Sequence, residues 1–161
     1  MEKERLVTAQ WVLERNLAWI AAAEVKVGVL CTVDTGMLGA LGAMFFAEQH
    51  RTPWLVLLAL LASGCLAAAL ACAAGALLPR VNGPNSSLLF FGCVTRLSAI
   101  EYGERFRTAS DADLLRDWTD QIHRNAEIAG IKHRWVRRAM GWSLLAVLPW
   151  TIALGLLGKV S

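Results

Sequence analysis

The chain has 161 residues, of which 56% are hydrophobic, and its mean hydropathy is +0.45. A soluble domain of this length rarely reaches that hydropathy, so the composition excludes a wholly soluble globular protein and indicates a membrane protein. The length allows one membrane block with one soluble block, and a net charge of +3 by itself identifies no class of partner.

The first predicted element is a proline-free helix that runs from Leu6 to Ala47. Its first part, residues 1–26, repeats apolar side chains at helical spacing and is predicted to be a cytosolic stalk helix. Its second part, residues 27–47, carries one charge, Asp34, and is predicted to be transmembrane helix 1. A bilayer core of ~30 Å needs about 20 helical residues, which this part supplies.

Two further runs carry no charge at all, residues 54–78 and residues 139–158, and each is predicted to cross the bilayer once. The sequence therefore predicts an all-α membrane protein with three transmembrane helices. Extensions of the first and third spans are expected to form a cytosolic helical stalk or bundle that is coupled rigidly to the membrane block.

The basic residues predict the orientation of these spans. Four Lys or Arg residues precede the first span, one lies between the first two, ten lie between the second and third, and one follows the third. Cytoplasmic loops carry an excess of Lys and Arg, so the N-terminus is predicted inside and the C-terminus outside. Fourteen of the sixteen basic residues then face the cytosol, and residues 79–138 form a cytosolic helical domain.

The predicted cytosolic domain begins with a loop, residues 79–87, which is dense in Pro, Gly, Asn and Ser. The short apolar segment that follows, residues 88–94, is expected to form a strand or a re-entrant turn packed on the stalk.

Two helix starts are predicted next. Ser98 followed by Glu101 has the capping-box form, and Ser110 with Asp113 is a weaker version of it. The second start opens a helix over residues 111–138 that is expected to run straight into the third span.

Asp34 is the first candidate functional residue. A carboxylate near the middle of a membrane is costly, so it must face protein or a water-filled path. Thr32 and Thr35 flank it. These three are interpreted either as pore-lining or gating groups at a homo-oligomer axis, or as a structural hydrogen bond to a neighbouring helix. Glu24 and Lys26, at the cytosolic end of the span, are either a gating contact or a helix-end anchor.

Small residues spaced four apart line the first two spans. They are Gly28, Thr32, Gly36 and Ala40 in the first, and Ala59, Ser63, Ala67, Ala71 and Gly75 in the second. Such stripes let helix backbones approach closely in lipid and predict tight packing within the chain or between chains. Three helices can hardly enclose a pore, so an ion path would require oligomerisation.

Basic and amide side chains of the cytosolic domain are the second candidate, as a ligand-binding surface. The set comprises Arg96, Arg105, Arg107, Gln121, Arg124, Asn125 and Lys132. Such groups suit phosphates and base edges, and Trp118 and Trp135 could supply stacking. The alternative is that the positive-inside bias alone explains the arginines, with no ligand at all.

The cysteines and a search for catalytic motifs indicate no further functional site in the sequence. The four cysteines are Cys31, Cys65, Cys72 and Cys93, and three of them fall in apolar runs. We expect small buried hydrophobes in preference to a disulfide or a metal site. No nucleotide-binding loop, zinc-protease motif, nucleophile elbow or acid/base pair is present, so we expect no catalytic activity, no cofactor and no metal.

Several segments in a fixed order resemble the Pycsar effector transmembrane family. They are LERNLAWIAAAEVKVGVLCTVDTGMLGALG at 13–42, FFG at 90–92, LSAIEY at 97–102 and DWTDQIHRNAEIAGIK at 117–132. The resemblance implies an antiphage defence effector of the bacterial inner membrane that answers a nucleotide signal and impairs the membrane. It also implies a membrane-entry motif at Glu24, Lys26 and Asp34, and a cytosolic helix motif that includes Gln121, Asn125 and Lys132.

Many Pycsar effectors carry a separate cyclic-nucleotide-binding domain, for which this chain has no room. It is more similar to short stand-alone relatives, including the transmembrane effector of the Hailong system, where single-stranded DNA oligomers hold an oligomeric channel shut. The resemblance thus implies a partner nucleotidyltransferase or cyclase, a single-stranded DNA oligomer or cyclic nucleotide as ligand, and a homo-oligomer, with a tetramer favoured. The alternative function is a non-conducting membrane scaffold that recruits a cytosolic partner.

Overall fold

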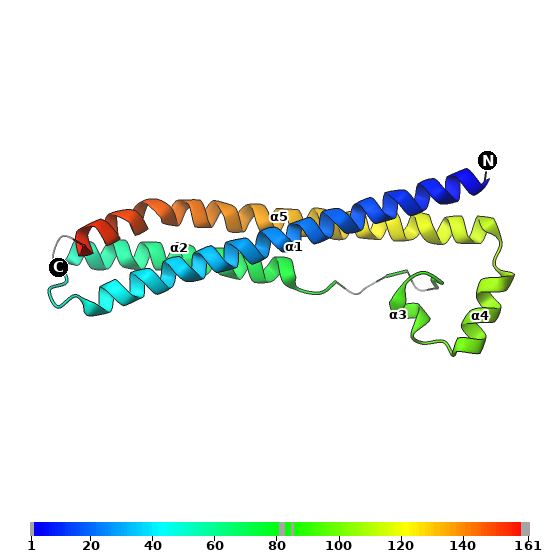
Figure 1. Cartoon of the computed structure of the whole chain (residues 1–161), viewed down its shortest axis with the longest axis horizontal. Coiled ribbons are helices and arrows are strands. Elements are labelled where there is room, and N and C mark those ends of the chain that lie inside the picture. The colour runs from blue at the N-terminus through cyan, green and yellow to red at the C-terminus, as the bar shows by residue number, and fades with distance from the viewer. Residues whose placement is uncertain (1, 81–82, 85, 159–161) are drawn as a thin grey trace. The chain divides into compact units, whose positions relative to one another are not determined.

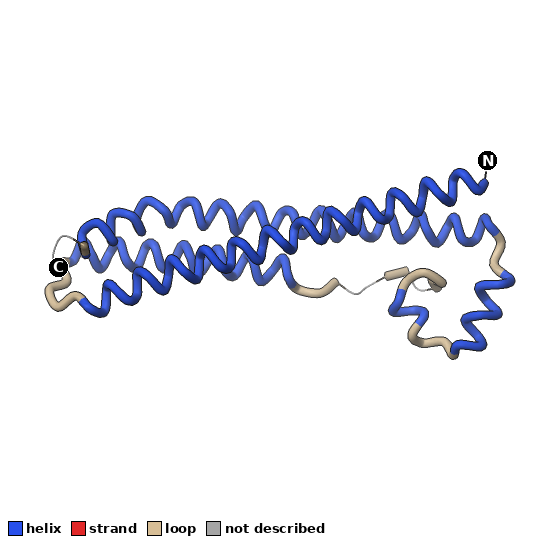
Figure 2. The backbone as a smooth tube through the Cα atoms, in the orientation of Figure 1, coloured by secondary structure: helices blue, strands red, loops and turns tan. Residues whose placement is uncertain are grey.

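The computed structural model describes residues 2–80, 83–84 and 86–158, and this part of the chain consists of helices and loops without strands (Figure 2). Figure 1 labels the helices, which in chain order are α1 (Glu2–Ala47), α2 (Pro53–Leu77), α3 (Phe91–Val94), α4 (Ala99–Thr108) and α5 (Asp111–Leu157). Helices α1, α2 and α5 are long and apolar enough to cross a membrane. The predicted all-α membrane fold with three spanning helices is therefore confirmed.

The chain divides into two compact units. The loop unit comprises Met1–Ala22 and Pro79–Ile131, and the bundle unit comprises Ala23–Leu78 and Lys132–Ser161. Helices α1 and α5 contribute residues to both units, whereas α2 belongs to the bundle unit and α3 and α4 belong to the loop unit.

A seam of small side chains on α2 packs the bundle unit. Its buried residues include Leu55, Ala59, Ala62, Leu66, Ala69, Ala73 and Ala76, spaced alternately by four and three. That alternation is the heptad pattern of helices that pack at about 20° to one another. Alanine predominates because small side chains let backbones approach closely, and close packing is what associates helices in lipid.

Two apolar clusters join the three helices of the bundle unit. The first contains Ala23, Val27, Ala73, Ala76, Val136 and Ala139. The second contains Leu41, Leu55, Ala59, Ala62, Ala153 and Leu157. On α1 the buried positions Val27, Asp34 and Leu41 are seven apart, so the carboxylate lies between the two clusters.

The predicted small-residue stripes differ from these seams. Gly28, Thr32, Gly36 and Ala40 are all exposed on α1, and of the α2 stripe only Ala59 and Gly75 are buried. A strict spacing of four drifts around the helix, whereas the seam between packed helices follows a period near 3.5. The stripe on α1 therefore faces away from the core of this chain.

Large apolar side chains cover the outside of the bundle unit. Leu144 is 71% exposed and Leu148 is 68% exposed on α5, and Leu60 on α2 is 67% exposed. Soluble proteins rarely expose a continuous apolar surface of this kind, and hydrocarbon is its natural surrounding.

Gly75 allows the close contact between α2 and α5. A Cβ at this position would lie 3.0–3.2 Å from atoms of the Trp135 ring, whereas a Cβ at Gly64 on the same helix would meet nothing within 4 Å. Gly75→Leu is expected to lower the free energy of unfolding by about 1–3 kcal/mol, because the ring would have to move. Gly64→Leu is the matched control and should not destabilise the chain. Denaturation in detergent followed by circular dichroism measures both, and equal effects would contradict the assigned contact.

Helices α4 and α5 begin at the predicted caps. The Ser98 hydroxyl accepts a hydrogen bond from the Glu101 backbone N–H at 3.2 Å. At the start of α5 the contact is reciprocal, because Ser110 Oγ accepts from the Asp113 N–H and Asp113 Oδ2 accepts from the Ser110 N–H, both at 3.2 Å. The start that looks weaker in sequence therefore forms the more complete capping box.

Of the two alternatives expected for residues 88–94, a strand or a re-entrant turn, the strand is wrong. The segment forms a turn and the single-turn helix α3. Ser87 Oγ accepts from the backbone N–H groups of Leu89 and Phe90, at 3.0 and 2.8 Å, and the Phe90 carbonyl then accepts from Cys93 and Val94. Because these local bonds satisfy the backbone, no strand partner is required.

Candidate functional site

Asp34 is fully buried in the bundle unit. The Ser143 hydroxyl of α5 donates to Asp34 Oδ2 at 2.9 Å. The same hydroxyl lies 3.0 Å from the Ala139 carbonyl, and a hydroxyl has one proton to donate, so it serves one acceptor at a time. The second carboxylate oxygen, Oδ1, is buried and has no hydrogen-bond partner among the described residues. Asp34 is thus half-satisfied at a position between the two apolar clusters of the bundle unit.

The structure does not bring Thr32 and Thr35 to this carboxylate. Both are exposed on α1, and the Thr32 hydroxyl donates to the Gly28 carbonyl of its own helix at 3.0 Å. Adjacent residues on a helix point in different directions, which explains why Asp34 turns inward while its neighbours turn outward. The predicted group of three therefore reduces in this chain to Asp34 alone, joined by Ser143.

Glu24 and Lys132 meet in the bundle unit, although the sequence suggested a separate role for each. Lys132 Nζ donates to Glu24 Oε1 at 2.8 Å and to the Ala76 carbonyl at 2.9 Å. Lys132 is 5% exposed, so its charge is almost entirely enclosed. Ala76 is in the last turn of α2, where carbonyls lack partners within their helix and the helix dipole favours a cation. One ammonium group thus joins α1, α2 and α5, while Lys26 remains exposed.

The segment before α3 is fastened to α5 within the loop unit. Asp117 Oδ2 accepts from the backbone N–H groups of Leu88 and Leu89, at 2.7 and 3.2 Å. Gln121 Nε2 donates to Ser87 Oγ at 3.1 Å, and Gln121 is 5% exposed. Gln121 thus positions this segment, and the Asn125 side chain donates to the Gln121 carbonyl at 2.9 Å.

A cavity of about 480 Å³ lies beside this segment, with Arg96 and Arg105 on its wall. Its other polar lining residues are Ser86, Ser87, Thr108 and Asp113. The hydrogen bond from the Ser110 hydroxyl, followed by that from the Ser110 backbone, lowers the pKa of Asp113, so this carboxyl stays ionised in neutral solution. Two guanidinium groups against one carboxylate leave the wall net positive, which suits an anion.

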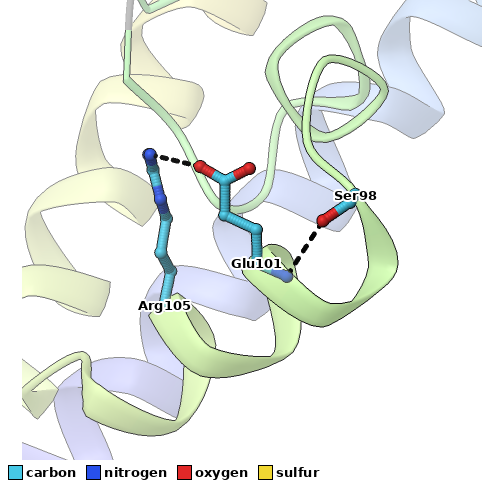
Figure 3. A network of polar contacts seen from close by, with 3 residues as sticks. All are labelled: Ser98, Glu101 and Arg105. Carbon is cyan, nitrogen blue, oxygen red and sulfur yellow. Dashed lines mark hydrogen bonds and ion pairs between the residues drawn. The ribbon is translucent and has the colours of Figure 1, made fainter.

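Figure 3 shows how Arg105 is held. Arg105 Nη2 lies 2.8 Å from Glu101 Oε1, and the two side chains are 56% and 47% exposed. An exposed pair of this kind contributes at most about 1 kcal/mol, so an anionic ligand can displace the glutamate. Arg107 and Arg124 are engaged elsewhere, since Arg107 donates to the Gly103 carbonyl and Arg124 pairs with Glu127 at 2.9 Å.

Sequence reasoning missed the residues that hold these groups in place. Ser143, Ser87 and Asp117 each bond a candidate residue or the cavity segment, and Asn16 donates to the Ile122 carbonyl at 3.1 Å within the loop unit. Ser143 had one usable signal, because a hydroxyl in a charge-free span commonly hydrogen-bonds across helices. The bonds of Asp117 and Asn16, and the bond between Ser87 and Gln121, join residues that lie far apart in the chain.

The four cysteines form no disulfide, and Trp135, one of the two tryptophans considered for stacking, packs against Gly75 in the bundle unit. All four cysteines are free and half-buried. The Trp135 ring packs over the position of Gly75, and Arg138 stacks above it at 5.2 Å. Trp135 therefore serves helix packing in the bundle unit.

A family model described as the Pycsar effector protein domain matches residues 8–158 of the chain. The match covers every helix described above except residues 2–7 at the start of α1. No curated protein and no solved structure matches the chain.

Proposed function

The chain belongs to the Pycsar effector family and is a transmembrane effector of antiphage defence, and we propose that it acts as an oligomeric ion channel or membrane-disrupting protein of the bacterial inner membrane. A nucleotide or a single-stranded DNA oligomer, made by a partner nucleotidyltransferase or cyclase, controls the path. Opening depolarises the membrane and arrests growth or kills the cell.

The proposed orientation puts residues 1–26 and 79–138 in the cytosol, with the spans at residues 27–47, 54–78 and 139–158. Its support is the distribution of charge, since fourteen of the sixteen Lys and Arg residues fall in the two cytosolic segments. The cavity with Arg96 and Arg105 lies in the loop unit, which is built from those segments. A ligand made inside the cell would then reach it directly.

The half-satisfied carboxylate of Asp34 is the observation that carries the proposal. A buried polar group without a partner is costly, and an ionisable group inside a membrane is costlier still, so such residues mark ion or proton paths. The bundle unit shields Asp34 completely, which is the arrangement expected of a closed path. Hydration of Asp34 in another arrangement, with further copies completing the pore, would supply the missing hydrogen bonds.

The cavity supports control by a phosphate-bearing ligand. Its volume of about 480 Å³ lies in the range of small-molecule sites and suits one nucleotide unit at a time. Arg96 and Arg105 can pair with phosphate oxygens, and the hydroxyls of Ser86, Ser87 and Thr108 offer further hydrogen bonds. An oligomer of copies would present several such cavities to one strand.

The cavity arginines are expected to determine ligand binding. Arg96→Gln with Arg105→Gln should weaken binding of a fluorescent deoxynucleotide oligomer or cyclic nucleotide at least tenfold for each arginine, because hydrogen bonds to a charged group contribute about 1.5–3 kcal/mol. Arg107→Gln with Arg124→Gln is the matched comparison, with the same loss of charge away from the cavity. Fluorescence anisotropy measures both pairs. Equal weakening by the two pairs would place the ligand outside this cavity.

The functional test is ion flux through liposomes that contain the purified chain, with and without the nucleotide that copurifies with it. Flux that changes with the nucleotide supports the channel. The alternative, a non-conducting scaffold, has its own observation: Trp11 and Trp19 in the loop unit are 56% and 54% exposed, as docking side chains would be. An absence of flux under both conditions would favour the scaffold.

A further inference from the structure

A second basic cavity lies in the bundle unit, and Lys26, which the sequence suggested as a gating contact or a helix-end anchor, lines it. It has a volume of about 290 Å³, and its lining residues are Lys26, His133, Arg134, Val136, Arg137 and Met140. Lys26 comes from α1 and the others come from α5. On α5 the spacings from 133 to 137, 134 to 137 and 137 to 140 are those of side chains that share one helix face.

The charge of this cavity is one-sided. Lys26, Arg134 and Arg137 contribute three positive charges, and no Asp or Glu of the described residues is among the lining side chains. Glu24, which is two residues from Lys26, is engaged by the buried Lys132 at 2.8 Å. The neighbouring Arg138 stacks over the Trp135 ring at 5.2 Å and is not part of the lining. Three cations are therefore gathered in one place.

The position of the cavity is at the boundary of the apolar surface. Residues 139–158 of α5 carry no charge, and residues 27–47 of α1 carry only Asp34, so Lys26, Arg137 and Arg138 are the cations next to the two apolar runs. Val29 on α1 and Leu144 on α5 are 60% and 71% exposed just beyond them. Met140 belongs both to the cavity and to this apolar exterior, at 46% exposed.

We propose that this cavity binds the phosphate headgroup of an anionic phospholipid. The three cations would contact the phosphodiester while Met140 and the apolar exterior contact the acyl chains. Basic pockets between helices at this depth suit such headgroups, and long Lys and Arg side chains reach the headgroup level readily. Soluble phosphates share the headgroup chemistry, but only a lipid also uses the apolar surface that begins at Met140.

The test is binding of phosphatidylglycerol to the full chain in detergent, followed by native mass spectrometry, with phosphatidylcholine as the neutral lipid. Arg134→Gln with Arg137→Gln should weaken phosphatidylglycerol binding about thirtyfold. Arg134→Lys with Arg137→Lys keeps the charge and should stay within a few-fold of the wild type. This conservative pair also shows that the α5 face tolerates substitution.

The sharpest control is the neighbouring arginine. Arg137→Gln and Arg138→Gln remove the same charge from adjacent positions, but only Arg137 lines the cavity. Arg137→Gln should weaken binding about fivefold, and Arg138→Gln less than twofold. Equal effects would overturn the proposal, since diffuse attraction to the surface would then explain the binding. Equal binding of the two lipids would also overturn it.

A soluble occupant is separated by competition. If inorganic phosphate or a single-stranded DNA oligomer displaces phosphatidylglycerol from the wild type, and Arg134→Gln with Arg137→Gln abolishes binding of that competitor, the cavity belongs to a soluble anion and the lipid assignment fails. This outcome is independent of the cavity in the loop unit, because the ligand test there uses Arg96 and Arg105.

Discussion

Replacing Lys132 with methionine is expected to lower the free energy of unfolding by about 2–3 kcal/mol. Methionine matches the lysine stem in length, so packing is largely kept. The substitution removes the lysine ammonium that donates to the Ala76 carbonyl in the last turn of α2, and a buried acceptor that loses a donor is costly. The three helices lose their common polar contact at one end of the bundle unit.

Two controls separate this contact from a general effect of charge. Glu24→Gln should cost less than about 1 kcal/mol, because the Glu24 side chain is 50% exposed and water can replace its half of the pair. Lys3→Met removes an exposed lysine and should leave stability unchanged. Unfolding by sodium dodecyl sulfate in mixed micelles, followed by circular dichroism, gives the three values. A Lys132→Met chain as stable as the wild type would show that the ammonium group contributes no net stabilisation.

The presence of three helices long and apolar enough to cross a membrane was predictable because the signal for each is local. A run of about 20 residues without charge identifies a span in any context. The caps at Ser98 and Ser110 depend on residues three positions apart, so spacing alone reveals them. The short segment at residues 88–94 escaped prediction because its apolar residues suit a strand or a turn equally well, and the decision came from Ser87 bonds to the backbone.

The direction in which each helix face points was much harder to predict. Gln121, Asn125 and Lys132 do share a stripe of α5, but polarity suggested that this stripe meets ligand or water. Gln121 and Lys132 are instead buried, each paired with a residue far away in the chain. Spacing shows which residues lie together on a helix, but only the packing of the other helices decides which face is enclosed. Among the predicted arginines, the cavity likewise selects Arg96 and Arg105 through the course of residues 86–97.

Asp34 shows both what the sequence predicts and what depends on helix packing. Its burial follows from a carboxylate in a span, yet its partner Ser143 lies 109 positions further along the chain. The contact satisfies one oxygen and leaves the other without a partner among the described residues. If the hydrogen bond of Asp34 is structural, replacing this residue should lower stability and leave ion flux unchanged. If Asp34 lines the ion path, replacing it should abolish flux and raise stability. Asp34 is therefore the most informative residue to change.

Asp34→Leu is expected to stabilise the bundle unit by about 1–3 kcal/mol while abolishing ion flux and toxicity. Stability should rise because an apolar side chain replaces a half-satisfied carboxylate. Flux should disappear because position 34 would no longer carry the charge that draws water between the helices. Asp34→Asn keeps an acceptor for Ser143 and should also lose flux, with a smaller gain in stability. Voltage-sensitive dye in growing cells and flux in liposomes measure function, and unfolding in detergent measures stability.

Ser143→Ala supplies the opposite change, since it removes the donor at 2.9 Å and leaves both carboxylate oxygens unpaired. The closed arrangement should become less stable, and basal ion flux should rise. Thr151→Ala is the matched control, because the exposed Thr151 hydroxyl of α5 donates to the Leu148 carbonyl of its own helix. If Asp34→Leu still depolarises cells, or if Ser143→Ala lowers stability without changing flux, then Asp34 serves a structural hydrogen bond and the ion path runs elsewhere. That result would not bear on the cavity with Arg96 and Arg105 or on the cavity with Lys26, Arg134 and Arg137, because Asp34 lines neither of them.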